Sequence, residues 1–231
     1  MRTIGLLGGM SWVSTGHYYR LINADIGARL GPEHCASLTL WQGDFAVIAE
    51  LQRAGRWDDA GQILAGGAKA LVAAGADLLA ICANTMHLCA PQITAAIGSV
   101  PVVDIVEVVR DQCLQLGISR LGLLGTSYTM ESPELYPVPL AAAGIDVIVP
   151  DTAQRAEIQR ITFDELIADV LTDQSRATFL DIASSLIERG AQGVVLACTE
   201  HGLLLADGDL SAPVLDSTIL HARRIVDLAL A

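Results

Sequence analysis

Two stretches of this chain match each other closely enough to indicate its fold: GADLLAICANT at Gly75–Thr85 and GAQGVVLACTE at Gly190–Glu200. Each contains a short apolar run that ends in small and polar residues, which is typical of a buried parallel strand and the turn after it. When the two are aligned, Ala83 falls on Cys198. The match predicts a repeated architecture, and this mismatch limits the chemistry that the chain can perform.

The repeat extends beyond these two stretches. IGLLG at Ile4–Gly8 returns as LGLLG at Leu121–Gly125, and SVPVVD at Ser99–Asp104 returns as SAPVLD at Ser211–Asp216. The three matches keep one order, with offsets of 117, 115 and 112 residues. Three matches in register indicate an internal duplication.

Composition narrows the class of protein. The 231 residues suit two small domains, given the duplication. Hydrophobic residues make up 52% of the chain and aromatic residues only 4%, so the core must consist of Ala, Leu, Val and Ile, as in sheets covered by helices on both faces. The net charge of −12 argues against nucleic acid and against an anionic membrane as partners.

The apolar pattern predicts alternating strands and helices. Expected strands are residues 4–8, 38–42, 78–82 and 100–104, then 121–125, 145–149, 194–197 and 213–215. Expected helices run from a cap at Ser14 or Thr15 to about Arg29, then over 57–74, 86–97, 105–116, 158–171, 176–189 and 219–230. Such βα units specify an α/β fold, here two pseudo-symmetric three-layer αβα domains with mostly parallel four-stranded sheets.

The duplicated Pro-Val-Val-Asp and Pro-Val-Leu-Asp segments each end one half of the chain and lead into a helix. We expect the final strand and helix to return to the first domain. This places residues 1–113 plus 212–231 in the first domain and residues 114–211 in the second.

The cellular setting is inferred from what the chain lacks. The richest apolar run, Ala70–Ala83, contains Asp77 and is shorter than the roughly 20 residues of a membrane span. The N-terminus has no signal-peptide pattern. The five cysteines include no CxxC pair, which disfavours disulfides and a zinc site. We therefore expect a soluble, cytoplasmic protein.

Polar residues follow the ends of four predicted strands. In parallel α/β sheets, ligands bind beyond the carboxyl ends of the strands, so these turns are expected to converge on one cleft between the domains. The turn Gly8-Gly9-Met10-Ser11 is not the GxGxxG of a dinucleotide site, which makes a tight turn the better interpretation. The candidate substrate-binding residues are Met10, Ser11, Asn84, Thr85, Thr126, Tyr128, Thr129, Thr199 and Glu200.

These motifs carry a family resemblance. The chain resembles the aspartate/glutamate racemase family, and most nearly its broad-specificity branch, through GGMSW at 8–12, NTMH at 84–87, Gly125-Thr126, CTE at 198–200 and Asp216-Ser217. The resemblance runs from end to end. It implies two α/β domains with the active site between them, an amino acid or related carboxylate as substrate, a homodimer, and racemisation with no pyridoxal phosphate and no metal.

Racemisation needs two acid/base groups, because a proton leaves one face of Cα and another arrives at the opposite face. A thiol suits this role when a helix N-terminus lowers its pKa, and Cys198 precedes a short helix expected near His201. Thr199 and Asn84-Thr85 offer donors for the substrate carboxylate, which would also stabilise the carbanion.

The family's first base stands immediately before Asn-Thr, and here that position is Ala83, which cannot titrate. Neighbouring Cys82 should point to the other face of the strand and belong to the core, unless a bulge turns it. Three hypotheses follow: an isomerase that uses water, Thr85 or a turned Cys82 on the second face; a single-thiol enzyme like the related arylmalonate decarboxylases; or a ligand-binding module without turnover.

Further residues near the motifs have two interpretations each. His201, three residues after Cys198, could favour the thiolate as a cation or could pack against its helix. His87 could orient the Asn84-Thr85 loop or serve only in packing. Glu200 could shape the site or cap the following helix.

The specificity of the site depends on a helix in the second half. Glu157 stands near the expected position of a basic residue, so like-charge contact would disfavour aspartate and glutamate unless Arg155 compensates. A neutral or cationic substrate side chain would then be preferred. Pro137 and Pro139 are expected to break a helix after Gly125-Thr126.

Overall fold

The computed structural model describes residues 1–231 and divides into two compact units, residues 1–104 with 221–231, and residues 105–220. Each unit has one four-stranded sheet, with the strand order β2-β1-β3-β4 in the first and β6-β5-β7-β8 in the second. All strand pairs are parallel. Because corresponding strands take corresponding places, the predicted fold class and the duplication are confirmed.

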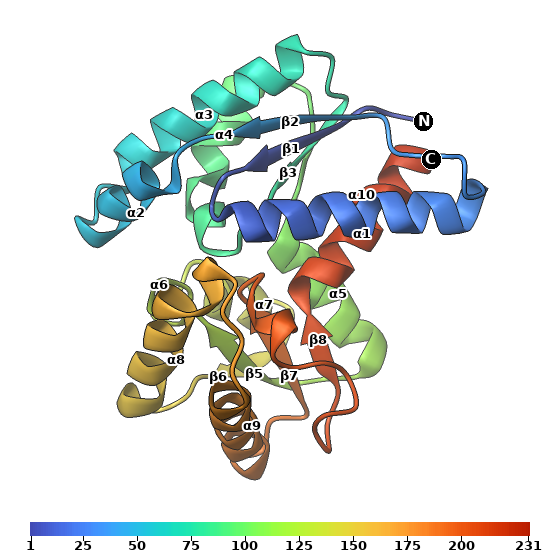
Figure 1. Ribbon diagram of the computed structural model, residues 1–231. Coiled ribbons are helices and arrows are strands. Elements are labelled where there is room, and N and C mark those ends of the chain that lie inside the picture. The colour runs from blue at the N-terminus through green and yellow to red at the C-terminus, as the bar shows by residue number, and fades with distance from the viewer. The chain divides into compact units, whose positions relative to one another are not determined.

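The first unit alternates strands and helices (Figure 1). Its strands are β1 (Ile4–Gly8), β2 (Leu38–Gln42), β3 (Leu78–Ile81) and β4 (Val102–Val103). Its helices are α1 (Trp12–Leu30), α2 (Phe45–Arg53), α3 (Trp57–Ala73), the 3-10 helix η1 (Thr85–Cys89) and α4 (Ala90–Ile97), followed much later by most of α10 (Ser217–Leu230).

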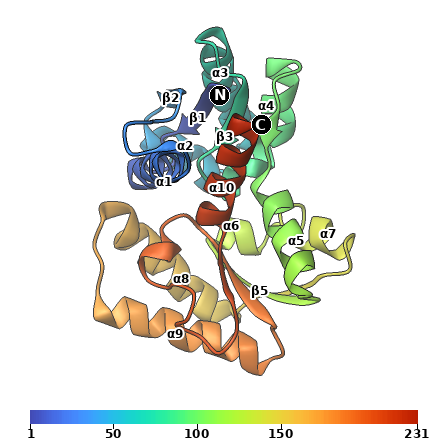
Figure 2. The same cartoon turned by 90° about the vertical axis from the view of Figure 1, so that its right-hand side faces the viewer.

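Successive side chains along the strands of this unit point to opposite faces of the sheet, and both faces are packed. Leu7, Leu79 and Ile81 join a core cluster with α2, α3 and α4. A Cβ atom built on Gly5 would lie 2.9 Å from the Cβ of Ala76, so β1 and the segment that follows α3 approach each other closely. The strand residues between these point to the opposite face, where α1 runs along the sheet (Figures 1 and 2).

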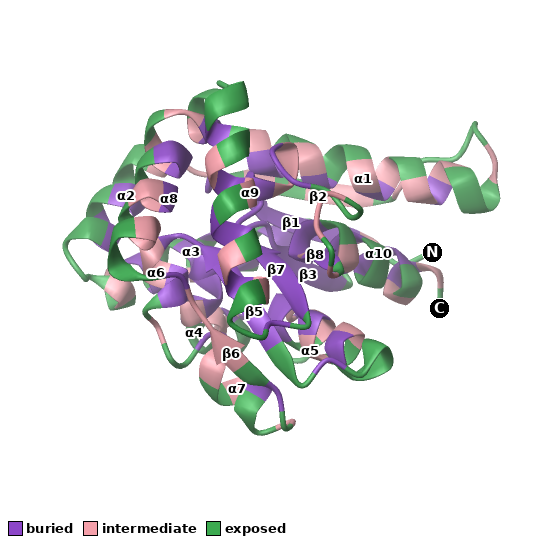
Figure 3. Ribbon diagram, turned by 90° about the horizontal axis from the view of Figure 1, so that it is seen from below, coloured by how far each residue is buried: buried purple, intermediate pink, exposed green.

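The second unit repeats the pattern. Its strands are β5 (Arg120–Gly125), β6 (Asp146–Ile148), β7 (Gly193–Ala197) and β8 (Val214–Asp216). Its helices are α5 (Ile105–Leu116), α6 (Ser127–Met130), α7 (Pro137–Ala141), α8 (Thr152–Asp164), η2 (Leu166–Ala168), α9 (Asp173–Glu188) and η3 (His201–Leu203). Figure 3 shows the inner strands of both sheets buried, with exposed residues on the outer helix faces.

The domain boundaries differ from those expected. The prediction that the final strand returns to the first domain is wrong, because β8 pairs with β7 through Val194–Val214 and Val195–Leu215. Helix α5 also lies in the second unit, whereas residues 105–113 were expected in the first. Only the final helix returns, where His221 bonds the carbonyl of Val103 at 2.9 Å and the N–H of Arg2 donates to the carbonyl of Ala229 at 2.8 Å.

Two expectations about helix ends also fail. Ser11, rather than Ser14 or Thr15, caps α1, and its Oγ accepts from the N–H of Ser14. Pro137 and Pro139 do not prevent a helix, because both lie in the first turn of α7. The N–H groups of a first turn have no partner within the helix, so proline costs little there.

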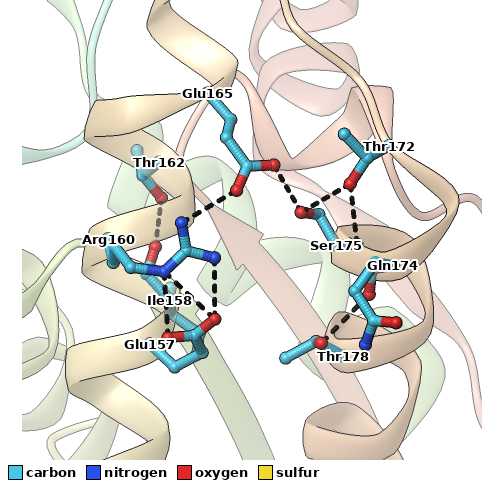
Figure 4. A network of polar contacts seen from close by, with 9 residues as sticks. All are labelled: Glu157, Ile158, Arg160, Thr162, Glu165, Thr172, Gln174, Ser175 and Thr178. Atoms are coloured by element: carbon cyan, nitrogen blue, oxygen red, sulfur yellow. Dashed lines mark hydrogen bonds and ion pairs between the residues drawn. The ribbon is translucent and has the colours of Figure 1, made fainter.

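A polar network joins α8 to α9 (Figure 4). Arg160 forms ion pairs with Glu157 and Glu165 at 2.8 and 2.9 Å, and Glu165 accepts from the hydroxyl of Ser175 on α9. The Ser175 hydrogen bond, more than Arg160, lowers the pKa of Glu165. The network fixes the hairpin that carries Glu157 and Arg155.

None of the helices combines the length and the apolar character that a membrane span requires.

Candidate active site

In the first unit, the turn after β1 lies beside the end of β3, because these strands are neighbours in the sheet. Gly9 has φ +85°, and a Cβ atom there would lie 2.6 Å from the carbonyl oxygen of Gly43, so the turn requires glycine. The hydroxyl of Thr15 accepts from the N–H of Gly9 at 2.9 Å and donates to the carbonyl of Ser11 at 2.8 Å. The hydroxyl of Ser14 reaches across to the carbonyl of Cys82 at 2.8 Å.

The Ala83-Asn84-Thr85 turn follows β3 and leads into η1. All three residues are buried, and only 7% of Ala83 is exposed. Nδ1 of His87 donates to the carbonyl of Ala83 at 2.8 Å, which ties the turn to the helix that follows it. The position that aligns with Cys198 therefore presents a methyl group on a backbone held from both sides.

His87 has the contacts of an orienting residue. Burial lowers its pKa, and the charge of Asp104 acts in the opposite direction. Its ring meets the ring of His221 edge-on, with centroids 5.9 Å apart, and His221 in turn bonds the hydroxyl of Tyr18 at 2.8 Å. A neutral His87 suits support of the loop, the first of the two interpretations given from the sequence.

Cys82 and Met10 both lie in the interior. Cys82 is fully buried, and burial raises the pKa of its thiol far above the ordinary range. Met10 belongs to the core cluster around α3. The expected core role of Cys82 agrees with this burial, and the turned orientation that would make it a base is not seen.

In the second unit, three consecutive side chains converge at the end of β7. The thiol of Cys198 donates to Oε2 of Glu200 at 3.2 Å, and the hydroxyl of Thr199 donates to the same oxygen at 2.7 Å. Cys198 is 8% exposed and Glu200 is 4% exposed. The side chain of Glu200 makes no capping hydrogen bond to η3, so the capping interpretation is not supported, and a role for Glu200 in the site stays a prediction.

The expected lowering of the Cys198 pKa is wrong. Burial raises the pKa of this thiol well above its ordinary value, and the negative charge of Glu200 raises it further. The backbone N–H of Glu200 acts in the opposite direction but does not compensate. Cys198 is therefore a protonated thiol near neutral pH.

His201 cannot act as the cation that would favour a thiolate. Burial lowers its pKa to about 3, although the carbonyl of Leu124 opposes this. Nε2 of His201 bonds the hydroxyl of Thr162 at 3.0 Å, and its ring packs edge-on to Phe179 with centroids 4.7 Å apart. The packing interpretation of His201 is supported.

The turn after β5 lies beside the end of β7, its neighbour in the sheet. Thr126 caps α6 by accepting from the N–H of Thr129 at 3.3 Å, and the two hydroxyls are also 3.3 Å apart. Tyr128 is half-buried on the same short helix. The structure thus brings Thr126, Tyr128 and Thr129 next to the strand that carries Cys198.

The residues expected to set specificity have partners in this unit. Glu157 pairs with Arg160, whose hydrogen bonds lower the pKa of the carboxyl. Arg155 pairs with Glu131 at 3.1 Å and donates to the carbonyl of Pro150 at 2.9 Å. Glu157 and Arg155 are thus each paired with a side chain of opposite charge in this unit.

Sequence reasoning did not assign a role to Asp216, which the structure places at the end of β8. One carboxylate oxygen accepts from the N–H groups of Thr218 and Ile219 at 2.8 and 3.1 Å, and the other lies against Gly202 in η3. The repeated Asp at the end of both Pro-Val segments is the pattern that could have identified it.

No group of three or more His, Cys, Asp or Glu side chains is arranged to hold a metal ion.

Each unit thus presents a cluster of the expected residues at the carboxyl edge of its own sheet. The first cluster contains Ser11 and the Ala83-Asn84-Thr85 turn, and the second contains Thr126 and the Cys198-Thr199-Glu200 turn. That the two clusters contact one substrate stays a prediction.

Comparison with known proteins identifies the family. The Asp/Glu/Hydantoin racemase family matches residues 7–225. A crystal structure described as an Asp/Glu racemase from Yersinia pestis superposes with a TM-score of 0.91 at 41% identity, and an aspartate racemase homologue from Pyrococcus horikoshii OT3 with 0.84 at 32%; both matches cover 100% of both chains. Unliganded arylmalonate decarboxylase shares the fold, with a TM-score of 0.52 at 17% identity over 99% of this chain and 93% of its own. The chain therefore belongs to the Asp/Glu/hydantoin racemase family.

Proposed function

We propose that this protein is a racemase-type isomerase that transfers protons at Cα of an amino acid without pyridoxal phosphate or a metal. The observation that carries the proposal is Cys198, a protonatable thiol at the carboxyl end of β7, flanked by Thr199 and Glu200 in a chain of this family. A thiol near a reacting carbon is a competent general acid and base.

The chemistry follows from the protonation state of Cys198. When the Cα proton passes to an acceptor on the face opposite Cys198, the electron pair of the broken Cα–H bond delocalises into the substrate carboxylate, and N–H or O–H donors that contact this carboxylate stabilise the charge. Because the raised pKa keeps the thiol protonated, its first step is to give the Sγ proton to the carbanion. The resulting thiolate can remove a Cα proton in the reverse direction, and a substrate ammonium group nearby would stabilise it.

The opposite face of Cα lacks a side chain able to exchange a proton at the Ala83 position. With Cys82 buried, water or the hydroxyl of Thr85 must serve that face. Neither has a pKa near neutrality, so general acid–base catalysis is weak on this side. We therefore propose slow racemisation compared with a two-thiol site.

A second candidate is a reaction that needs proton transfer on only one face of Cα. Ala83 specifically favours it, because alanine supplies no acid or base on the opposite face. In a decarboxylation, the C–C bond to a carboxylate breaks, CO2 leaves, and the carbanion takes the Sγ proton of Cys198. Such a reaction needs one acid and no opposing base. The shared fold with arylmalonate decarboxylase shows only that this architecture accommodates that activity in a relative.

We further propose a substrate with a neutral or cationic side chain. Arg155 is paired with Glu131, and Glu200 adds negative charge at the Cys198 turn. A second carboxylate on the substrate would meet repulsion from Glu200, and Arg155 already has a carboxylate partner. A panel of acidic, neutral and basic amino acids tests this, and fastest turnover of aspartate or glutamate would contradict it.

Incubation of single enantiomers in D2O tests the main proposal. Deuterium incorporation at Cα from both the L and D forms, together with inversion, supports racemisation. Exchange of one enantiomer with retained configuration supports the single-face reaction. Ligand-induced thermal stabilisation without any exchange would instead indicate a binding module.

Two cysteine variants assign the chemistry. Cys198→Ser should abolish exchange, because a serine hydroxyl is far too weakly acidic to replace the thiol. Cys35→Ser is the matched control, since Cys35 is exposed, and it should leave exchange unchanged. Exchange that survives in Cys198→Ser would refute the role of Cys198.

A further inference from the structure

We propose that Glu200 is a positioning residue for Cys198: its carboxylate accepts the thiol hydrogen and keeps the thiol in the protonated form from which it delivers a proton. This inference deepens the proposed function and rests on Cys198 as the acid/base group. It gives Glu200 a role that acts through the thiol, rather than a contact with substrate.

The geometry of three consecutive residues carries the inference. Oε2 of Glu200 accepts from Sγ of Cys198 at 3.2 Å and from Oγ1 of Thr199 at 2.7 Å. These two hydrogen bonds direct the carboxylate back toward the end of β7, and it makes no capping hydrogen bond to η3. The second hydrogen bond, from Thr199, fixes the carboxylate oxygen in front of the thiol.

Burial makes this pair electrostatically significant. Both residues lie away from solvent, where a charge is weakly screened and a hydrogen bond to a carboxylate is strong. The pKa of Cys198 is raised first by burial and then by the charge of Glu200.

The other charged and titratable groups of the unit do not reverse this effect. Asp216, at the end of β8, acts in the same direction as Glu200 but less strongly. His201, on η3, is neutral because burial lowers its pKa to about 3. Glu200 is therefore the acidic side chain with the largest influence on the thiol.

The Cys198–Glu200 hydrogen bond sets the order of proton transfers on the face of Cα that Cys198 serves. Transfer breaks the Sγ–H bond, forms the Cα–H bond and leaves a thiolate beside the Glu200 carboxylate. Two neighbouring negative charges are unfavourable, so the thiolate is a strong base that readily regains a proton from Cα or from water. Glu200 thus makes Cys198 a weaker acid at rest and a stronger base once ionised.

Alkylation of the thiol measures this role without any substrate. The full chain with Cys35→Ser is treated with iodoacetamide across a pH series, and the peptide that carries Cys198 is quantified by mass spectrometry. Glu200→Gln removes the charge, so the midpoint of alkylation should move to lower pH by about one unit, which is roughly a tenfold rise in rate below the midpoint. Glu188→Gln, an exposed change of the same charge, should leave the profile unchanged.

Glu200→Asp keeps the inference testable if the glutamine variant does not fold. Aspartate retains the charge. The pH midpoint of Cys198 alkylation in Glu200→Asp should therefore stay closer to the wild-type midpoint than that of any folded neutral variant, such as Glu200→Ala. An unchanged midpoint in Glu200→Gln, or a shift to higher pH, would overturn the inference. A shifted midpoint in a protein that exchanges no amino acid would sustain the Cys198–Glu200 pairing while refuting the proposed racemase activity.

Discussion

At the scale of single residues, the difference between Ala83 and Cys198 has the largest chemical consequence. The two positions are equivalent in the duplication, as the strand orders of the two sheets show. One carries a thiol hydrogen-bonded to a carboxylate, and the other carries a methyl group on a turn held by His87. The sequence alone identified this contrast, but it could not show that the Glu200 carboxylate turns back onto the thiol.

Restoring an acid/base group at position 83 should raise racemisation. Ala83→Cys or Ala83→Thr is expected to increase the inversion rate about a hundredfold, because a positioned general acid/base typically contributes 10²–10⁴-fold. Chiral chromatography of the product measures it. Adding Cys82→Ala to Ala83→Cys should not remove the gain, since Cys82 is buried. An unchanged rate in both single variants would contradict the missing-base hypothesis.

Gly202 is a second position where one side chain decides the local structure. A Cβ atom there would lie 2.1 Å from Oδ2 of Asp216, the residue that caps α10. Gly202→Ala should therefore destabilise the protein by about 1–3 kcal/mol, as overpacking does. Gly66→Ala is the control, because Gly66 has open space on α3 and alanine favours helix by about 0.5–1 kcal/mol. Urea denaturation compares the two, and equal effects would contradict the clash.

At the scale of elements, the features with a clear apolar pattern were the most predictable. The bounds of β1, β2 and α5 match the predicted residues. An apolar run marks β1, a short stretch rich in strand-forming residues marks the partly exposed β2, and helical periodicity marks α5. Helices α6 and α7 have four and five residues, too few to show a period, and were not predicted. Nine-residue α2 was also missed.

The place of β8 could not be derived from local pattern, because strand pairing is a long-range property. The duplication held the necessary information: β4 pairs with β3 in the first sheet, so its repeat β8 should pair with β7 in the second. The direction of the Cys198 pKa was missed for a related reason. Helix position suggested a lowered value, but burial and the rotamer of Glu200 determine the result.

The contact between α1 and α10 supplies a prediction at this scale. Nε2 of His221 must donate to the carbonyl of Val103, so in the neutral ring Nδ1 accepts from the hydroxyl of Tyr18. Tyr18→Phe should destabilise the first unit by about 1–3 kcal/mol, because a buried acceptor loses its donor. Tyr19→Phe is the matched control, since Tyr19 is 53% exposed. Equal urea midpoints for both variants would contradict this account.

At the scale of the whole molecule, each unit contains a buried neutral histidine. Burial lowers the pKa of His221 in the first unit to about 3, with neighbouring His87 adding to the effect, and lowers that of His201 in the second unit to about 3. In the unfolded chain both have a pKa of about 6.5. Between these values the unfolded state binds more protons than the folded state, so stability rises with pH.

The resulting pH dependence is testable on the intact chain. Stability should be full above about pH 6.5 and should fall as the pH is lowered toward 3, by up to about 1.4 kcal/mol per pH unit for each such histidine. His201→Gln retains a donor for Thr162 but removes this titration, so differential scanning calorimetry from pH 7.5 to 5 should give a flatter Tm profile for the variant. His34→Gln, at an exposed position, should keep the wild-type slope. A wild-type Tm that does not fall between pH 7 and pH 5 would show that these histidines do not stay neutral in the folded protein.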